Sequence, residues 1–193
     1  PLDMFTVYAI ALSCLLSVSL SSPSCEDLIR PMDHLDVHNL EGRRALVAGS
    51  LSDKEYIETF KSRDSAVIDF DNSTDPSKIS FKRAFNFNGT CSSLNTDVTL
   101  EGSGFTLPKL NFTITFYHTA CQDCLLSVFN NKDTNHQRLY LFSKRRQVEP
   151  KEMDDFTAQA QCLKMTAPVL MDPTKELCPE SSAEDKTEEK MEA

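Results

Sequence analysis

The residues best able to form covalent cross-links are seven cysteines spread along the 193-residue chain. Cys14 lies in an apolar leader, so six cysteines belong to the remainder of the chain. An even number of cysteines outside a leader is typical of a secreted domain held by disulfide bonds. Their spacing does not select one pairing among the many that are possible. The six are Cys25, Cys91, Cys121, Cys124, Cys162 and Cys178.

Cys121 and Cys124 form a Cys-x-x-Cys motif between two predicted strands. In cytosolic chains this motif can serve thiol redox chemistry near a helix and a parallel sheet, but neither is predicted around it here. We expect a local disulfide that staples a hairpin turn. Two alternatives stay open: free thiols that bind a soft species such as an organotin or a zinc ion, and pairing with other cysteines.

A single cation interrupts an apolar face in the segment 79–87. Phe81, Arg83 and Phe85 alternate with other residues, so all three face the same side of a strand. Because burying an unpaired cation is costly, Arg83 predicts either a partner carboxylate or an anionic or polar ligand. The alternative is a shift of register that turns Arg83 outward.

Residue patterns for catalysis are sparse. The chain has four histidines, and it shows no nucleophile motif, glycine-rich phosphate loop or paired-histidine metal spacing on a helix. We therefore expect neither an enzyme nor a cofactor nor a metal site. The formal net charge of −9 argues against a nucleic-acid partner, because phosphates require clusters of lysine and arginine.

The first 24 residues predict a signal peptide. Residues 4–20 are apolar and uncharged, small residues follow them, and Met4 is the expected start, with residues 1–3 upstream of it. A transmembrane anchor is the alternative, which the short run without flanking cations disfavours. Residues 25–179 form the predicted domain, and 180–193 form an acidic tail expected to be disordered. Three glycosylation sequons agree with secretion and begin at Asn72, Asn88 and Asn111.

Short alternating segments separated by turn residues make up most of the predicted domain. They are typical of an antiparallel sheet that closes on itself to hide its edges. Late in the chain Met153, Phe156, Ala160 and Leu163 form one apolar stripe of a helix that begins at Pro150. We expect an all-β fold, an eight-stranded up-and-down barrel with this helix packed outside. The predicted strands cover 45–51, 66–71, 79–87, 94–100, 110–119, 125–130 and 138–143.

Several motifs make the chain resemble the lipocalins, and within them the orosomucoid branch. They are Cys25-Glu-Asp-Leu-Ile-Arg-Pro, Leu40-Glu-Gly-Arg-Arg-Ala-Leu-Val-Ala-Gly-Ser, Asp53-Lys-Glu-Tyr, Gly89-Thr-Cys91, Ala160-Gln-Cys162-Leu-Lys and Glu176-Leu-Cys178-Pro. The resemblance extends from Cys25 to about Glu180. It is greatest to the fish proteins that bind tributyltin, saxitoxin or tetrodotoxin.

The resemblance implies two disulfide bonds, Cys25 with Cys162 and Cys91 with Cys178. It also marks one departure, because lipocalins usually carry Gly-x-Trp where the first strand begins. Here the match is Gly42, Arg43 and Arg44, and the chain has no tryptophan. Arg44 is expected to reach the rim, pair with an acid, or reach the cavity floor.

The positions that match the orosomucoid ligand pocket are mostly apolar, as in other small-molecule sites. Strand alternation selects the same face for three of them. The alternative is that the aromatic side chains simply fill the barrel as a core. The positions are Leu46, Tyr56, Ile68, Phe81, Arg83, Phe85, Phe129, Tyr140 and Phe142.

Together these features predict a secreted, monomeric carrier that reversibly binds and transports a small hydrophobic or amphipathic molecule inside the barrel, with no membrane span. By resemblance, tributyltin, saxitoxin and tetrodotoxin are candidate ligands. An arginine in the pocket favours a neutral or weakly acidic lipophile over the cationic guanidinium toxins. The rival hypothesis is an immune-modulating glycoprotein of the acute-phase type that acts through its surface, with the barrel as a scaffold.

Overall fold

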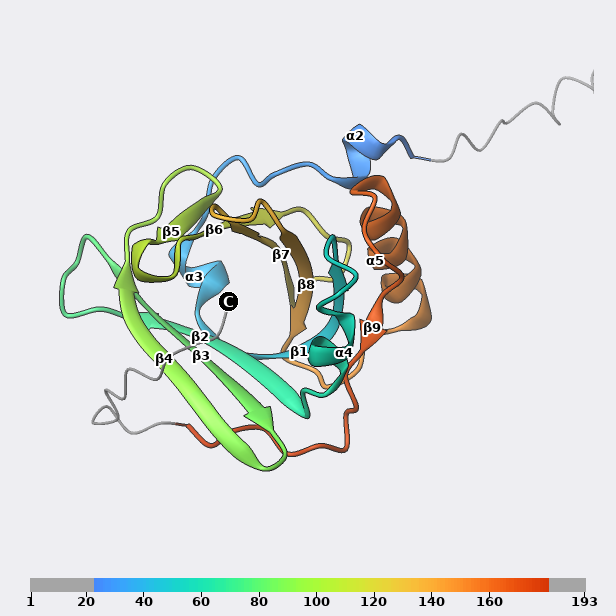
Figure 1. Cartoon of the computed structure of the whole chain (residues 1–193). Coiled ribbons are helices and arrows are strands. Elements are labelled where there is room, and N and C mark those ends of the chain that lie inside the picture. The colour runs from blue at the N-terminus through green and yellow to red at the C-terminus, as the bar shows by residue number, and fades with distance from the viewer. Residues whose placement is uncertain (1–22, 181–193) are drawn as a thin grey trace, which may run out of the picture.

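The computed structural model of the chain describes residues 23–180. Its strands form one antiparallel, nearly closed barrel, and a helix packs on the outside of the wall (Figure 1). This is the predicted all-β fold. Most of the predicted leader (residues 1–22 of 1–24) and of the predicted tail (residues 181–193 of 180–193) lies outside the described residues. None of the helices between residues 23 and 180 has the length and hydrophobicity of a membrane-spanning segment.

Eight strands form the wall in the spatial order β4-β3-β2-β1-β8-β7-β6-β5. Sequential strands are neighbours, as in an up-and-down barrel, and β1 with β8 makes the one non-sequential pair in this order. A ninth short strand, β9 (Val169–Leu170), pairs with β1. The eight are β1 (Gly42–Leu51), β2 (Ser65–Asn72), β3 (Ile79–Phe87), β4 (Thr90–Val98), β5 (Gly104–Leu107), β6 (Phe112–Tyr117), β7 (Cys124–Asn131) and β8 (Gln137–Ser143).

Strand β5 corrects the sequence prediction, which placed no strand between 100 and 110. The strand has four residues, too few for alternation to stand out. Its first residue is Gly104, and only glycine fits there, because a Cβ would lie 1.8 Å from the carbonyl oxygen of Ile114 on β6. A three-residue 3-10 helix, η1 (Pro108–Leu110), then leads into β6.

A β-bulge in β1 changes which side chains face the interior. The register with β8 shifts between Leu46 and Ala48. Leu46 belongs to the interior apolar cluster, whereas Ala48 belongs to the cluster under the outer helix. The bulge therefore turns Gly49 inward, opposite Tyr140 on β8.

The predicted late helix is α5 (Pro150–Cys162). Pro150 occupies its first turn, and Glu149 with Glu152 forms a capping box. The predicted stripe is confirmed, because Phe156 and Ala160 are buried and Met153 and Leu163 pack beside them. Gln159 is not part of this apolar stripe, yet it is 5 % exposed, and its side-chain amide donates to the carbonyl oxygens of Leu28 and His118. These bonds tie the N-terminal segment to the helix.

Three short helices were not predicted from the sequence. They are α2 (Cys25–Leu28), α3 (Val37–Leu40) and α4 (Ile57–Lys61). Each has only four or five residues, so no repeating apolar stripe can form. Helix α3 directly precedes the start of β1, and α4 follows the end of β1, so the two helices lie at opposite ends of the barrel. Below, the end at α3 is called the closed end and the end at α4 the open end, after the usual form of the lipocalin barrel.

The described part of the chain has three disulfide bonds, two of which join residues far apart in the sequence. Cys25 pairs with Cys162, and Cys91 pairs with Cys178, the two pairs that the resemblance implies. The first ties α2 to the end of α5, and the second ties β4 to the C-terminal segment. Cys121 and Cys124 form the third, local bond, as the turn-staple prediction expects.

Arg44 closes the end of the barrel where lipocalins usually carry tryptophan. Its side chain is 5 % exposed and donates to backbone carbonyl oxygens of Asn39 (2.9 Å), Leu40 (2.6 Å) and Glu41 (3.2 Å) at the end of α3. Burial lowers the pKa of Arg44, and Asp123 and Asp69 partly offset this effect. A hydrogen-bonded guanidinium thus takes the place of an apolar plug, and it donates N–H groups to the carbonyl oxygens that the end of a helix leaves unpaired.

Candidate ligand-binding site

The predicted site residues share the inner face of the barrel. Six of the nine lie in the buried interior cluster, two more pack against it, and Arg83 occupies the same face of β3 between Phe81 and Phe85. Outward-facing neighbours such as Leu126, Val128 and Leu139 instead pack under α5. On β3, where alternation predicted that Phe81, Arg83 and Phe85 share a face, the prediction is correct. The six are Leu46, Ile68, Phe81, Phe129, Tyr140 and Phe142, and the two are Tyr56 and Phe85.

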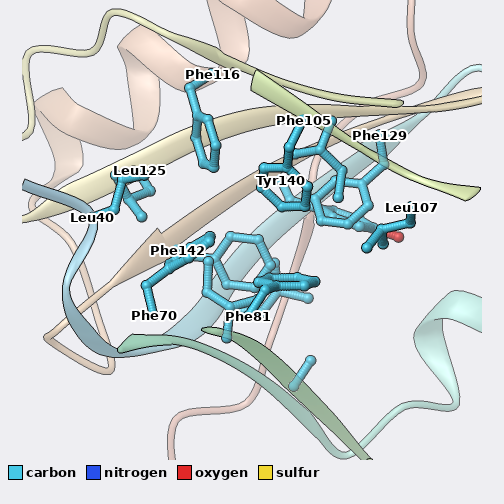
Figure 2. Close-up of a cluster of buried hydrophobic side chains, with 14 of the residues drawn as sticks. Leu40, Phe70, Phe81, Phe105, Leu107, Phe116, Leu125, Phe129, Tyr140 and Phe142 are labelled. Atoms are coloured by element: carbon cyan, nitrogen blue, oxygen red, sulfur yellow. The ribbon is translucent and has the colours of Figure 1, made fainter. Parts of the chain in front are cut away.

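Aromatic rings pack against one another in the half of the barrel near α3. The rings of Phe70 and Phe81 lie 5.1 Å apart, as do those of Phe81 and Phe105, and Phe116 lies 6.0 Å from Phe70 (Figure 2). Phe105 comes from the strand that the sequence did not predict. In this half of the barrel the aromatic side chains therefore fill the interior as a core, which was the alternative to a ligand pocket.

Helix α4 places a ring inside the open half. Phe60 is fully buried and stacks on Tyr140, with ring centroids 5.7 Å apart and planes within 11°. Tyr140 also contacts the rings of Phe129 (5.2 Å) and Phe142 (5.9 Å) (Figure 2). The mouth of the barrel is thus lined by aromatic side chains from both strands and the α4 segment.

Arg83 is buried in the wall, which rules out the outward register. Its side chain is 8 % exposed, and its guanidinium carbon lies 5.0 Å from the centre of the Phe85 ring. Burial lowers its pKa to about 10, so the group stays protonated at neutral pH. The phenols of Tyr140 and Tyr56 raise this pKa, and the nearby cations Arg63 and Arg138 lower it.

Arg63 and Arg138 are the site residues that sequence reasoning missed. Arg63 is 6 % exposed, and its guanidinium lies over the rings of Phe60 (5.1 Å) and Phe85 (4.4 Å). Its Nε and Nη1 atoms are buried and have no hydrogen-bond partner. Arg138 lies over the ring of Tyr56 at 4.3 Å.

A signal for one of the two arginines was present in the sequence. Arg138 alternates with Tyr140 and Phe142 along β8, so it had to share their face. Arg63 lies in the connection before β2, where no periodicity applies. Its place inside the mouth depends on how α4 folds over the barrel.

The three arginines make the open half of the interior cationic. The guanidinium groups of Arg63 and Arg138 lie close enough to Arg83 to lower its pKa. Within residues 23–180, no ion pair joins Arg63 or Arg138 to a carboxylate. Arg63 has two N–H donors without a hydrogen-bond partner, and a guanidinium that lies on an aromatic ring can bind a carboxylate or phosphate through two parallel hydrogen bonds. The arrangement can therefore hold an anionic head group while the rings contact an apolar chain.

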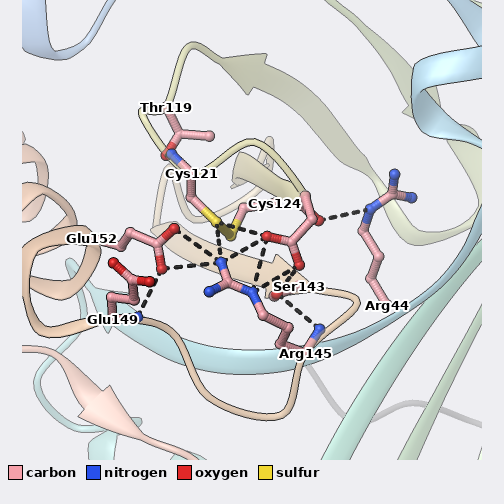
Figure 3. Close-up of polar contacts among 9 residues, drawn as sticks. Arg44, Thr119, Cys121, Cys124, Ser143, Arg145, Glu149 and Glu152 are labelled. Carbon is pink, nitrogen blue, oxygen red and sulfur yellow. Dashed lines mark hydrogen bonds and ion pairs between the residues drawn. A yellow bond between two sulfur atoms is a disulfide. The ribbon is translucent and has the colours of Figure 1, made fainter.

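The Cys121–Cys124 turn has a structural role at the closed end. Asp123 accepts hydrogen bonds from Ser143 Oγ (2.8 Å) and Arg145 Nη2 (2.7 Å), and Arg145 also donates to Glu152 of α5 at 2.9 Å (Figure 3). The bonds from Arg145 and Ser143 hold the pKa of Asp123 at about 2. The turn, β8 and α5 are thereby joined.

The same turn brings together three possible metal-ligand atoms, from Cys121, Asp123 and Cys124. Both sulfur atoms are engaged in the disulfide bond, and the carboxylate is engaged by Arg145. The structure therefore supports the turn-staple prediction over the alternative of free thiols that bind a soft ion.

A hollow of about 550 Å³ lies on the outside of the barrel, near its closed end. Its lining is mixed in charge and includes Glu41, Arg43, Asp69, Asp71 and Lys144. Such a surface suits a lipophile poorly, because apolar ligands gain by leaving water for an apolar lining. We therefore place the candidate site inside the barrel.

The three sequons differ in exposure. Asn72 and Asn88 are exposed, whereas Asn111 is half-buried and its side-chain amide donates to Asp133. Glycosylation at the three positions stays a prediction.

Residues 33–182 match the model of the ApoM domain. The chain belongs to the ApoM-domain family. This family has a lipocalin fold, which agrees with the resemblance to the lipocalins. No relative is found among the curated proteins.

A solved structure agrees with the family assignment. The siderocalin Ex-FABP, said to function through dual ligand specificities, superposes with a TM-score of 0.63 at 14 % sequence identity. The match covers 75 % of this chain and 96 % of that one. At such identity the likeness shows the fold of this ApoM domain alone.

Proposed function

We propose that this ApoM domain is an extracellular, non-enzymatic carrier that binds a small amphipathic molecule with an anionic group inside its barrel. The observation that carries the proposal is the cluster of Arg63, Arg83 and Arg138 among the aromatic rings of the open half. The lipocalin-type barrel supports reversible binding of an apolar body. The three disulfide bonds support an extracellular location.

The ligand would enter from the α4 end with its apolar part leading. Its head group would lie between Arg63, from the connection before β2, and Arg138, from the start of β8, with Arg83 deeper in the wall. Tyr56, Phe85, Phe129 and Tyr140 would contact the first part of the chain. The remaining predicted residues, Leu46, Ile68, Phe81 and Phe142, would form the floor.

The resemblance to the orosomucoid branch suggested three specific ligands, tributyltin, saxitoxin and tetrodotoxin. We rank each of them below an anionic amphiphile. Saxitoxin and tetrodotoxin are guanidinium cations, and three arginines repel them. Tributyltin is a lipophile without a negative group, so it would gain from the aromatic rings but would bring no negative charge to the three guanidinium groups. The cluster therefore favours a lipophilic carboxylate or phosphate over all three.

The proposal is tested by comparing ligands that share one chain and differ only in the head group. Isothermal titration calorimetry would be run with stearic acid, stearyl alcohol and stearylamine. We expect the acid to bind about tenfold or more tightly than the alcohol, and the amine to bind most weakly. Equal affinities, or no binding of the acid, would overturn the anionic-ligand proposal.

Variants locate the head group. Arg63→Met and Arg138→Met keep apolar contact area while they remove the charge, so each should abolish most of the preference for the acid. Arg30→Met changes an exposed arginine in the N-terminal segment and serves as the matched control. A preference that survives in both inner variants would place the head group elsewhere.

A further inference from the structure

Ser127 is a buried hydroxyl on the interior wall of the barrel. It lies on β7 between Leu125 and Phe129, which both belong to the interior cluster, while Leu126 and Val128 face outward under α5. Alternation therefore directs Ser127 inward. Its register neighbours are Phe116 on β6 and Tyr140 on β8, both in the same interior cluster.

The hydroxyl of Ser127 has no hydrogen-bond partner, although the residue is 0 % exposed. Leaving a buried hydroxyl unpaired costs about 1–3 kcal/mol in proteins. Every neighbour named above is apolar or aromatic and larger than serine. The wall therefore carries an unused donor and acceptor among apolar and aromatic side chains.

Ser127 lies deeper in the barrel than the arginine at the mouth. On β8, Arg138 pairs with Phe129, and Tyr140 pairs with Ser127. Ser127 is therefore two residues nearer to the closed end than the row of Arg138, which is about 7 Å along the strand. Strands β3 and β7 are four places apart in the eight-stranded order, so Ser127 faces the wall that carries Arg83.

From these positions we infer that Ser127 is a specificity-determining residue that binds a second oxygen of the ligand, partway along its apolar chain. The ligand class is then an amphiphilic anion with an internal hydroxyl or keto oxygen, rather than a plain saturated acid. The inference rests on the proposed carrier function, because it assumes that the anionic end lies among the arginines. A site that hydrogen-bonds a buried ligand oxygen discriminates against the analogue that lacks it.

Positional isomers of one acid test the inference. Calorimetric titration would compare stearic acid, 2-hydroxystearic acid and 9-hydroxystearic acid, in which the hydroxyl is absent, beside the head group or in mid-chain. We expect 9-hydroxystearic acid to bind about fivefold more tightly than the other two, the effect of one net hydrogen bond.

Ser127→Ala should bring the three affinities to parity. This variant removes an unpaired buried hydroxyl without adding atoms, so it is expected to fold with unchanged or higher thermal stability. Ser80→Ala is the matched control, because Ser80 is nearly buried on β3 but faces away from the interior, with Oγ bonded to Asn95. It should keep the fivefold preference.

The outcomes separate the two hypotheses. Equal affinities of the three acids for the unchanged protein would overturn the role of Ser127 and leave the carrier proposal intact. A mid-chain preference that persists in Ser127→Ala would also overturn it. Failure of all three acids to bind would overturn the proposed function and this inference together.

Discussion

The ring of Phe60 lies directly on Gly49 and occupies the space that a side chain there would need. A Cβ on Gly49 would lie 2.3 Å from Cζ of Phe60. Phe60 comes from α4, and Gly49 comes from the inner face of β1 beyond the bulge. This contact lets the α4 segment insert an aromatic ring into the mouth of the barrel, beside Tyr140.

Replacing Gly49 with alanine should therefore displace Phe60. We expect Gly49→Ala to lower the free energy of unfolding by about 1–3 kcal/mol, the usual effect of overpacking a buried site. The measurement is urea unfolding followed by circular dichroism. In a Phe60→Ala background the same substitution should cost much less, and equal costs in the two backgrounds would show that the contact is not the cause.

Arg44 should be essential for the closed end of the barrel. Arg44→Ala removes hydrogen bonds to the carbonyl oxygens of Asn39, Leu40 and Glu41, so it leaves buried acceptors unpaired. We expect the free energy of unfolding to fall by roughly 2–4 kcal/mol. Arg44→Trp should not restore it fully, because the indole has one donor. A near-neutral effect of Arg44→Ala in denaturant titrations would contradict this account of the closed end.

The Asp123–Arg145 pair predicts a specific loss of stability in acid. The pKa of Asp123 is held at about 2 against an ordinary value of 3.8, so its stabilising effect is complete above about pH 4 and is lost as the pH falls towards 2. Unfolding midpoints in urea should therefore drop between pH 4 and pH 3 more steeply in the parent protein than in Asp123→Asn. Asp33→Asn, at an exposed carboxylate, is the control and should follow the parent.

The three disulfide bonds should contribute unequally. Cys25–Cys162 and Cys91–Cys178 join residues 137 and 87 positions apart, whereas Cys121–Cys124 spans three. Because a longer loop restricts the unfolded chain more, each long-range bond should contribute about 2–5 kcal/mol and the local bond less. Paired serine substitutions, compared by their urea midpoints, test the order. A loss for Cys121→Ser/Cys124→Ser as large as for the other pairs would show that its main role is in the folded state.

Much of the barrel could be predicted because its signals are local. Alternation along β3 fixes which of its side chains share a face, so it correctly placed Phe81, Arg83 and Phe85 on one side, whereas Tyr140 and Phe142 were named from the family resemblance. The spacing of Met153, Phe156 and Ala160 likewise predicted the buried side of α5. The disulfide pairs, by contrast, were implied by family resemblance and not by the spacing of the cysteines.

Local patterns in the chain were enough to predict the class of fold, the faces of its longer strands and the cation at the centre of the site. The folded arrangement was needed to show that Arg63 joins Arg83 near α4, that Arg44 closes the far end, and that the hydroxyl of Ser127 has no hydrogen-bond partner. The physical reason is that periodicity records the direction of a side chain within one element. It does not record what the loops, the bulge and the opposite wall bring against it.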